Sequence, residues 1–424
     1  MGMKKSIKIK VVVLLLTFQC YAKAQSNYFL FYEKNFSEKA GAENILILHK
    51  AFYSAEERIL PANPFGEKNV GVKIANGGYR LIKSFLIDYP VDYFIAETQH
   101  EAFGHGARFR EFKWRNTSYH MSLPPPYGDG HGFATGYPPF NSTDDEHTTM
   151  VFSGVESGQV LAESMREKWI MADSINYRDF FLYGGEFNNL TNYIYQTLYK
   201  VKNGKKITGG NDMNNYIYDI NSKYYLQINA GEKKYSIDDL GKYSILNFID
   251  PYQYMALYHW MSYIISGKEK GKLPMIKIGK VKYLPSFNMS LSPFGAEFYD
   301  HNYLKWKNRV ANIYLRIGDP RFEKFYGFGI KTMNLLNTKY GFLHTSVDVW
   351  NQPSLKLQSG TSKTRTTAAG YGYCFTGTLG IKVLGKKNPV SIVVQPGYKT
   401  DGFVKGEILS KGFFMRFGIG IENL

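Results

Sequence analysis

The chain is poor in cysteine. Only two of its 424 residues are cysteines, Cys20 and Cys374, and the first lies in a segment that we predict is removed. A single remaining thiol cannot form an intrachain disulfide, which excludes the disulfide-dense scaffolds of small secreted proteins. A chain of this length can bury a hydrophobic core without such bonds.

Long apolar runs and basic clusters are also missing. Beyond the N-terminus, no apolar run approaches the roughly 18 residues of a membrane-spanning helix. Lysine and arginine (52) exceed aspartate and glutamate (36), but the basic residues are not gathered as in nucleic-acid-binding proteins. We therefore expect no nucleic-acid partner, and we attribute the positive charge to solvated surfaces near anionic lipid headgroups.

Residues 1–24 are typical of a secretory signal peptide. Lysines precede an apolar run that begins at residues 11–16, and Ala22-Lys23-Ala24 fits an A-x-A cleavage site. Cys20 does not indicate a lipoprotein, because the residue before it, Gln19, is too large and polar for that signal. We expect cleavage after Ala24 and export of the mature chain.

The most informative segment is His100-Glu101-Ala102-Phe103-Gly104-His105, an H-E-x-x-x-H. Two neutral histidines can bind a catalytic Zn²⁺, and the glutamate can act as general base on the metal-bound water. The spacing is one residue longer than in H-E-x-x-H, so on a regular helix the histidines diverge by roughly 140°. A π-bulge would restore their convergence, and Gly104 is where a distortion is best tolerated.

Glu97 shares the helix face of the two histidines, which makes it a further candidate near the metal. Together with His100 it also forms an E-x-x-H, as in di-iron carboxylate bundles. That site would need a second E-x-x-H, and none follows in the sequence.

A third protein ligand is expected on a later helix, within residues 153–163. We assign Glu156 as this ligand because glycines and a serine around it leave room for a metal. Glu163 lies seven residues on, on the same side of the helix, and is expected to orient a histidine. Glu163, His131 and His147 remain rival ligands.

The loop over residues 116–148 is long and rich in turn-forming residues. Long loops without regular structure are usually functional or disordered, and the aromatic residues and histidines here favour function. We expect the loop to frame a substrate cleft in which His120, His131 or Tyr127 stabilises an oxyanion.

The H-E-x-x-x-H, with glycine before its second histidine, resembles the signature of the dipeptidyl peptidase III family and, more broadly, of gluzincin metallopeptidases. The resemblance implies that His100 and His105 are zinc ligands, Glu101 the general base and Glu156 the later ligand. It covers one helix and part of another. The family has paired glutamates in its second motif, whereas Val155 precedes Glu156 here.

The C-terminal third alternates between apolar and polar residues, and its segments of about ten residues carry aromatics near their ends. This pattern resembles the small outer-membrane β-barrels of Gram-negative bacteria. Short connections follow the second, fourth and sixth strands, and long ones follow the fifth and seventh, which places both barrel ends in the periplasm. Eight strands are predicted, at 283–291, 294–304, 308–318, 324–336, 339–350, 369–385, 389–399 and 412–422.

The sequence thus predicts an α+β protein of two domains after the signal peptide. Residues 25–272 form a mainly helical, zincin-like metallohydrolase domain, and residues 273–424 an antiparallel transmembrane β-barrel of about eight strands. Residues 202–235 are expected to be a polar excursion. Helices are expected at 40–58, 75–88, 91–111, 148–174, 188–201 and 236–266.

The expected function is that of a zinc peptidase, anchored in the outer membrane, facing the periplasm and acting on a peptide or protein. The barrel would then contact lipid and serve as an anchor without a pore. An alternative is that the barrel is the functional part and the helical domain is a non-catalytic module for binding or assembly.

Overall fold

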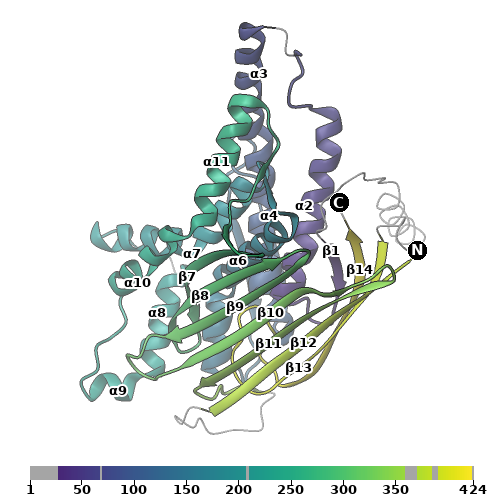
Figure 1. Cartoon of the computed structure of the whole chain (residues 1–424). Helices are drawn as coiled ribbons and strands as arrows, with labels where there is room; N and C mark the ends of the chain where they lie inside the picture. Colours follow the sequence, from purple (N-terminus) through teal and green to yellow (C-terminus); the bar gives the residue numbers. More distant parts are fainter. Residues whose placement is uncertain (1–26, 67–68, 207–209, 359–369, 384–389, 423–424) are drawn as a thin grey trace, which may run out of the picture.

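The computed structural model describes residues 27–66, 69–206, 210–358, 370–383 and 390–422. The predicted signal peptide lies outside these residues. The first half of the chain is mainly helical, and a large antiparallel sheet occupies the C-terminal half, with helices against the inner face of the curved sheet (Figure 1). The predicted mixture of α and β structure is therefore confirmed.

The large sheet has ten strands in the order β1-β14-β13-β12-β11-β10-β9-β8-β7-β6. Its eight long strands coincide with the eight predicted ones, which confirms the period-two alternation as a strand signal. The bounds are β1 Asn27–Tyr32, β6 Ile276–Ile278, β7 Val281–Ser292, β8 Gly295–Trp306, β9 Arg309–Gly318, β10 Tyr326–Asn337, β11 Gly341–Gln352, β12 Gly370–Lys382, β13 Val390–Lys399 and β14 Gly412–Glu422.

The prediction of a closed barrel is wrong. Among the described residues, the sheet ends at β6, which pairs with β7, and at β1, which pairs with β14. These two end strands do not pair with each other. An eight-stranded barrel has room inside only for its own side chains. Here helix α6 (Asp144–Ala172) packs against the inner face, and a helix about 10 Å across requires a wider, open sheet.

Helices are present in all the predicted ranges, but the predicted helix over 236–266 is divided into α10, η3 and α11, and two further segments differ from expectation. The polar excursion over 202–235 contains α8 and α9, and the loop over 116–148 contains the hairpin β2–β3 and the start of α6. The remaining elements are α2 Glu38–Ile59, α3 Val70–Lys83, the π-helix η1 Ser84–Asp88, α4 Tyr89–Thr98, the π-helix η2 Gln99–His105, α5 Gly106–Glu111, β2 Arg115–Met121, β3 Gly132–Tyr137, β4 Ser174–Asn176, α7 Asp179–Lys202, α8 Asp212–Lys223, α9 Tyr225–Asn229, α10 Ile237–Ser244, the 3-10 helix η3 Ile245–Ile249, α11 Pro251–Ser266 and β5 Lys270–Lys272.

Helix α6 is the central element of the fold. It begins with a capping box, in which Thr143 and Glu146 bond each other's backbone, and ends at Asp173 in the left-handed conformation. Its residues belong to two apolar cores, each of which also contains side chains from the large sheet. The predicted boundary near residue 273 therefore marks a change of secondary structure and not a break between separate cores.

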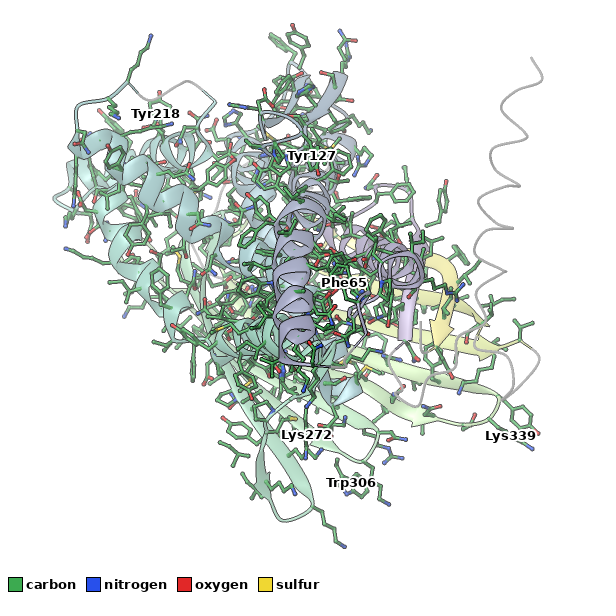
Figure 2. All side chains as sticks on the ribbon, turned by 90° about the horizontal axis from the view of Figure 1, so that it is seen from above. Phe65, Tyr127, Tyr218, Lys272, Trp306 and Lys339 are labelled. Carbon is green, nitrogen blue, oxygen red and sulfur yellow. The ribbon has the colours of Figure 1, made fainter. Side chains whose placement is uncertain are left out.

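In a soluble β-sandwich the inner face of each sheet is apolar and the outer face is polar. This sheet has the reverse arrangement. The inner face carries buried charges, which are paired: Arg316 with Glu297 at 3.2 Å, Lys331 with Glu167 of α6 at 2.7 Å. The outer face is apolar and exposed, and Trp306 and Lys339 lie at its turns (Figure 2). The exposed outer side chains include Ile317, Phe328, Val349, Tyr371, Phe375, Leu379, Ile381, Ile392, Phe413, Phe417 and Ile419.

Within the part of the chain that the structure describes, no helix is both long and apolar enough to cross a membrane.

The inner-face charges give a stability prediction. Arg416 is 2 % exposed and binds Glu33 at 2.7 Å together with Glu407. Arg416→Met would leave the buried Glu33 without its cation and Glu407 with Lys39 alone, so we expect a loss of roughly 3–5 kcal/mol of unfolding free energy. Chemical denaturation of the purified protein measures this loss.

The matched control is Lys202→Met, because Lys202 and Asp238 form an ion pair at 3.6 Å with both side chains more than half exposed. We expect a change within about 1 kcal/mol there. Equal effects of the two substitutions would contradict the assignment of Arg416 as a structural cation.

Candidate metal centre

The H-E-x-x-x-H lies on a π-helix. Residues Gln99–His105 form η2, between α4 and α5, so the wider helical turn absorbs the additional residue of the motif. His100 and His105 consequently face one another, with ring centroids 5.0 Å apart. The geometry that the sequence required for convergence is therefore present.

Asp212 completes a group of three possible metal ligands. Its Oδ2 lies 3.6 Å from His100 Nε2 and 3.5 Å from His105 Nε2. In the described part of the chain this is the one trio of such residues whose donor atoms all lie within 4.8 Å of each other. Donors of a tetrahedral zinc site stand about 3.3 Å apart, given bonds of about 2.0–2.1 Å. The three side chains thus fit a divalent metal with little movement.

The surroundings hold both imidazoles in place. His105 donates from Nδ1 to the carbonyl of Met150 at 2.8 Å, which leaves Nε2 for a metal. The His100 ring stacks on Tyr193 of α7, with an interplanar angle of 13°. Burial lowers the pKa of His105, but Asp212, Glu101 and the hydrogen bond to Met150 together raise that pKa to about 9.

Two glycines allow η2 to approach α6 closely. A Cβ on Gly104 would lie 2.7 Å from Gly154 Cα, and a Cβ on Gly154 would lie 2.3 Å from His100 Nε2. No side chain other than hydrogen fits at either position without displacing the neighbouring helix or the imidazole. Gly104 therefore serves the packing of the two helices as well as the motif's spacing.

Glu101 and Glu97 lie beside the histidines under the start of β3. A Cβ on Gly132 would come 2.2 Å from Glu97 Oε2 and 3.2 Å from Glu101 Oε1. Glu101 is buried, and its Oε2 accepts no hydrogen bond from the described residues. Burial raises the pKa of Glu97, with a further contribution from Glu101 and an opposing one from His100.

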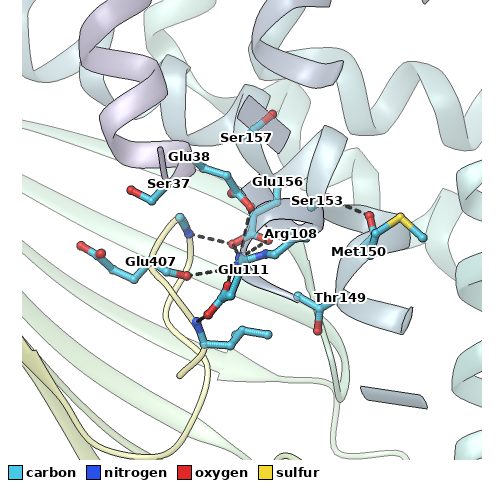
Figure 3. A network of polar contacts seen from close by, with 12 residues as sticks. Ser37, Glu38, Arg108, Glu111, Thr149, Met150, Ser153, Glu156, Ser157 and Glu407 are labelled. Atoms are coloured by element: carbon cyan, nitrogen blue, oxygen red, sulfur yellow. Dashed lines mark hydrogen bonds and ion pairs between the residues drawn. The ribbon is translucent and has the colours of Figure 1, made fainter. Parts of the chain in front are cut away.

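Glu156 does not join the metal centre, so its assignment as a ligand is corrected. Arg108 binds its carboxylate at 3.2 Å, and the backbone N–H of Gly406 donates to it at 2.7 Å (Figure 3). The same guanidinium binds Glu38 at 3.1 Å and Glu111 at 3.0 Å. The α6 face that meets the histidines carries Gly154, two residues away, so Glu156 points elsewhere.

The other acidic and histidine candidates on α6 also lie elsewhere. Glu163 does contact a histidine, but it is His301 of the sheet, at 3.4 Å, and Glu163 also binds Lys405. His147 pairs with Asp219 at 2.8 Å. The predictions of Glu163 as orienting partner of a ligand, and of Glu163 or His147 as third ligand, are therefore not supported by the geometry.

The hairpin β2–β3 carries the remaining predicted residues. His120 is exposed and stacks on Phe133, with centroids 5.0 Å apart. His131 is exposed beside Asp129, yet it is near enough to Glu97 to lower its pKa. Tyr127 is exposed at the end of the hairpin (Figure 2). Of these three side chains, His131 is the one that affects the pKa of Glu97, beside the candidate metal centre.

Sequence reasoning missed Asp212, Glu186 and Tyr193. Asp212 opens a helix after the N-cap Asn211, and the pair Asn-Asp before an apolar periodicity at 213, 216 and 220 is the available signal for that helix. Glu186 and Tyr193 are seven residues apart on α7 and hence on one side of it. Nothing in the sequence alone places that side against His100.

Comparison with known proteins gives no relative: no family model, no curated protein and no solved structure matches this chain.

The close helix contact yields a prediction. Gly154→Ala would place a methyl group against the His100 ring. We expect this variant to bind metal more weakly and to lose roughly 1–3 kcal/mol of unfolding free energy. Gly185→Ala on α7 is the control, because no atom lies within 4 Å of its Cβ position.

In the control, alanine replaces glycine inside a helix and should stabilise by about 0.5–1 kcal/mol. Thermal unfolding and zinc titration of both variants measure these opposite effects. A Gly154→Ala protein as stable as the wild type would refute the described helix contact.

Proposed function

We propose that this protein is a zinc-dependent hydrolase, in the first instance a peptidase. The observation that carries the proposal is the convergence of His100, His105 and Asp212, with Asp212 Oδ2 3.5–3.6 Å from the two Nε2 atoms and all donor atoms within 4.8 Å of one another, next to the buried carboxylate of Glu101. Two histidines and one carboxylate form a ligand set of catalytic zinc sites, which leave a fourth position for water.

The chain's own residues have distinct tasks in this reaction. When bound, zinc would acidify a water molecule and polarise the scissile carbonyl. Glu101 is adjacent to a ligand, and its Oε2 has no hydrogen-bond donor among the described residues, so it is available to take a proton from water. It can then return that proton to the leaving amine.

The hairpin β2–β3 supports a peptide as substrate. Its second strand, β3, begins at Gly132, which lies directly against Glu97 and Glu101, so an extended strand starts beside the metal centre. His131 lies on it near Glu97 and is our candidate for stabilising an oxyanion. The preference for peptides over other acyl substrates rests on the H-E-x-x-x-H resemblance.

We further propose that the sheet anchors the chain in an outer membrane, with lipid as its partner. An apolar outer face and a charged inner face are what a lipid-embedded sheet requires. The predicted signal peptide would direct the chain to that compartment, with the metal centre on the periplasmic side.

The metal assignment is tested by elemental analysis of the purified protein. Asp212→Asn should bind one zinc fewer per chain than the wild type, because an amide does not replace an anionic ligand. Asp219→Asn is the matched control on the same helix, where the carboxylate binds His147 and no site residue. Equal zinc content in all three proteins would refute this centre.

The catalytic assignment is tested by Glu101→Gln on a peptide library. We expect zinc to be retained while turnover falls by roughly 10²–10⁴, since the proton acceptor is lost. Cleavage that is undiminished in this variant would favour the alternative of a non-catalytic helical module, with the sheet as the functional part.

The lipid contact is tested by flotation with phospholipid vesicles. Ile381, Ile392 and Ile419 are paired neighbours on β12, β13 and β14, each about half exposed. Lysine at all three should abolish co-flotation, at roughly 2–4 kcal/mol for each residue near the midplane.

The control for flotation places three lysines at exposed apolar positions on the helices, at Tyr218, Leu226 and Tyr258. This variant should still float with the vesicles. Wild-type protein that folds but stays out of the lipid fraction would refute the membrane anchor.

A further inference from the structure

Glu186 is a buried carboxyl group that the proposed reaction does not use. It lies on α7 with none of its surface exposed, and neither oxygen has a hydrogen-bond or ion-pair partner among the described residues. An isolated ionised carboxylate is costly to bury, so such a group is either protonated or binds a cation. Burial and the nearby Glu97 raise the pKa of Glu186.

The location of Glu186 connects it to the metal centre. A Cβ on Gly158 would lie 2.1 Å from Glu186 Oε2, as a Cβ on Gly154 would lie 2.3 Å from His100 Nε2. The two glycines are four residues apart, and such positions on a helix are about 5–6 Å from each other. The Glu186 carboxyl and the His100 imidazole therefore occupy adjacent places on the same face of α6.

Two more carboxyl groups lie on α4, which packs against α7, and on η2, which follows α4. Glu97 and Glu101 both lie against Gly132 of β3, and Oε2 of the buried Glu101 lacks a partner within the described chain. Among the described residues, no lysine or arginine forms an ion pair with Glu97 or Glu186, and burial is the largest cause of the raised pKa of each. Glu97 thus lies beside Glu101 and is also near enough to Glu186 to raise its pKa, and none of the three carboxyl groups has a lysine or arginine partner among the described residues.

The geometry points to a second divalent-cation site, held by Glu97 and Glu186 next to the site of His100, His105 and Asp212, with Glu101 between the two. This inference rests on the proposed function and makes the centre dinuclear. Oxygen ligands from carboxylates suit Mn²⁺, Mg²⁺ or Zn²⁺, with water completing the coordination. In two-metal hydrolases the cations stand about 3.5–4 Å apart and together hold the attacking water.

The carboxylates must move to close around this second cation. In the described residues only His100, His105 and Asp212 already bring three donors within 4.8 Å. Rotation of the Glu97 and Glu186 side chains, which lie on facing helices, provides the remaining approach. We expect the second site to be the weaker one, filled after the first.

The experiment is a titration of the metal-free, full-length mature protein with Zn²⁺ and with Mn²⁺, followed calorimetrically and by metal analysis after gel filtration. We expect two cations per wild-type chain and one per Glu186→Gln chain, with the tighter site unchanged. Glu167→Gln, a buried glutamate paired with Lys331 at 2.7 Å, should still bind two.

The metal-free variants provide a second measurement. Glu186→Gln removes an unpartnered acid without breaking a hydrogen bond, so the metal-free variant should melt no lower than the metal-free wild type. Addition of Mn²⁺ should raise the melting temperature of the wild type and of Glu167→Gln more than that of Glu186→Gln.

Failure of this inference and failure of the proposed function give different results. One cation per chain in both the wild type and Glu186→Gln, lost in Asp212→Asn, would refute the second site, leave the zinc hydrolase intact and identify Glu186 as a neutral buried acid. No cation in any of the proteins would refute both.

Discussion

The candidate centre depends on the contact between the π-helix η2 and α6. There the backbones of the two helices approach each other closely at Gly104 and Gly154. Without the wider turn of η2 the histidines of an H-E-x-x-x-H would point apart, and without the glycines the imidazole of His100 would have no space. The close approach also positions the hydrogen-bond partner of His105, since the Met150 carbonyl of α6 accepts a hydrogen bond from His105 Nδ1.

The candidate metal centre differs from other parts of the molecule in whether its buried carboxylates are paired with arginine or lysine. Inside the sheet and at its junction with the helices, carboxylates meet arginine or lysine: Arg108 alone binds Glu38, Glu111 and Glu156 (Figure 3). Around η2 the acids have no such cation. Adjoining buried carboxyl groups without a lysine or arginine partner are a feature of sites that bind an external cation.

The sequence predicted those features that follow from local periodicity and spacing. Each long strand was visible because its side chains alternate between two environments, and the π-turn followed from the spacing of the two histidines. Sheet closure was not predictable, since it depends on what fills the interior, here α6. Asp212 was missed for a related reason: a ligand supplied by a distant helix is fixed by packing, and Glu156 had equally suitable neighbours in sequence but Arg108 in space.

The position of Asp212 couples metal binding to the packing of α8. Met213, Tyr216 and Ile220 are fully buried on one side of that helix and dock it on the core around α6. Asp212 precedes them by one residue, so the ligand meets the histidines only when the helix is docked. A cation bound by all three side chains therefore stabilises the docked helix, and the docked helix raises the affinity for the cation, by the same free energy. With a cation bound as proposed, the metal centre and the helical half of the fold would form one cooperative unit, held together across α6.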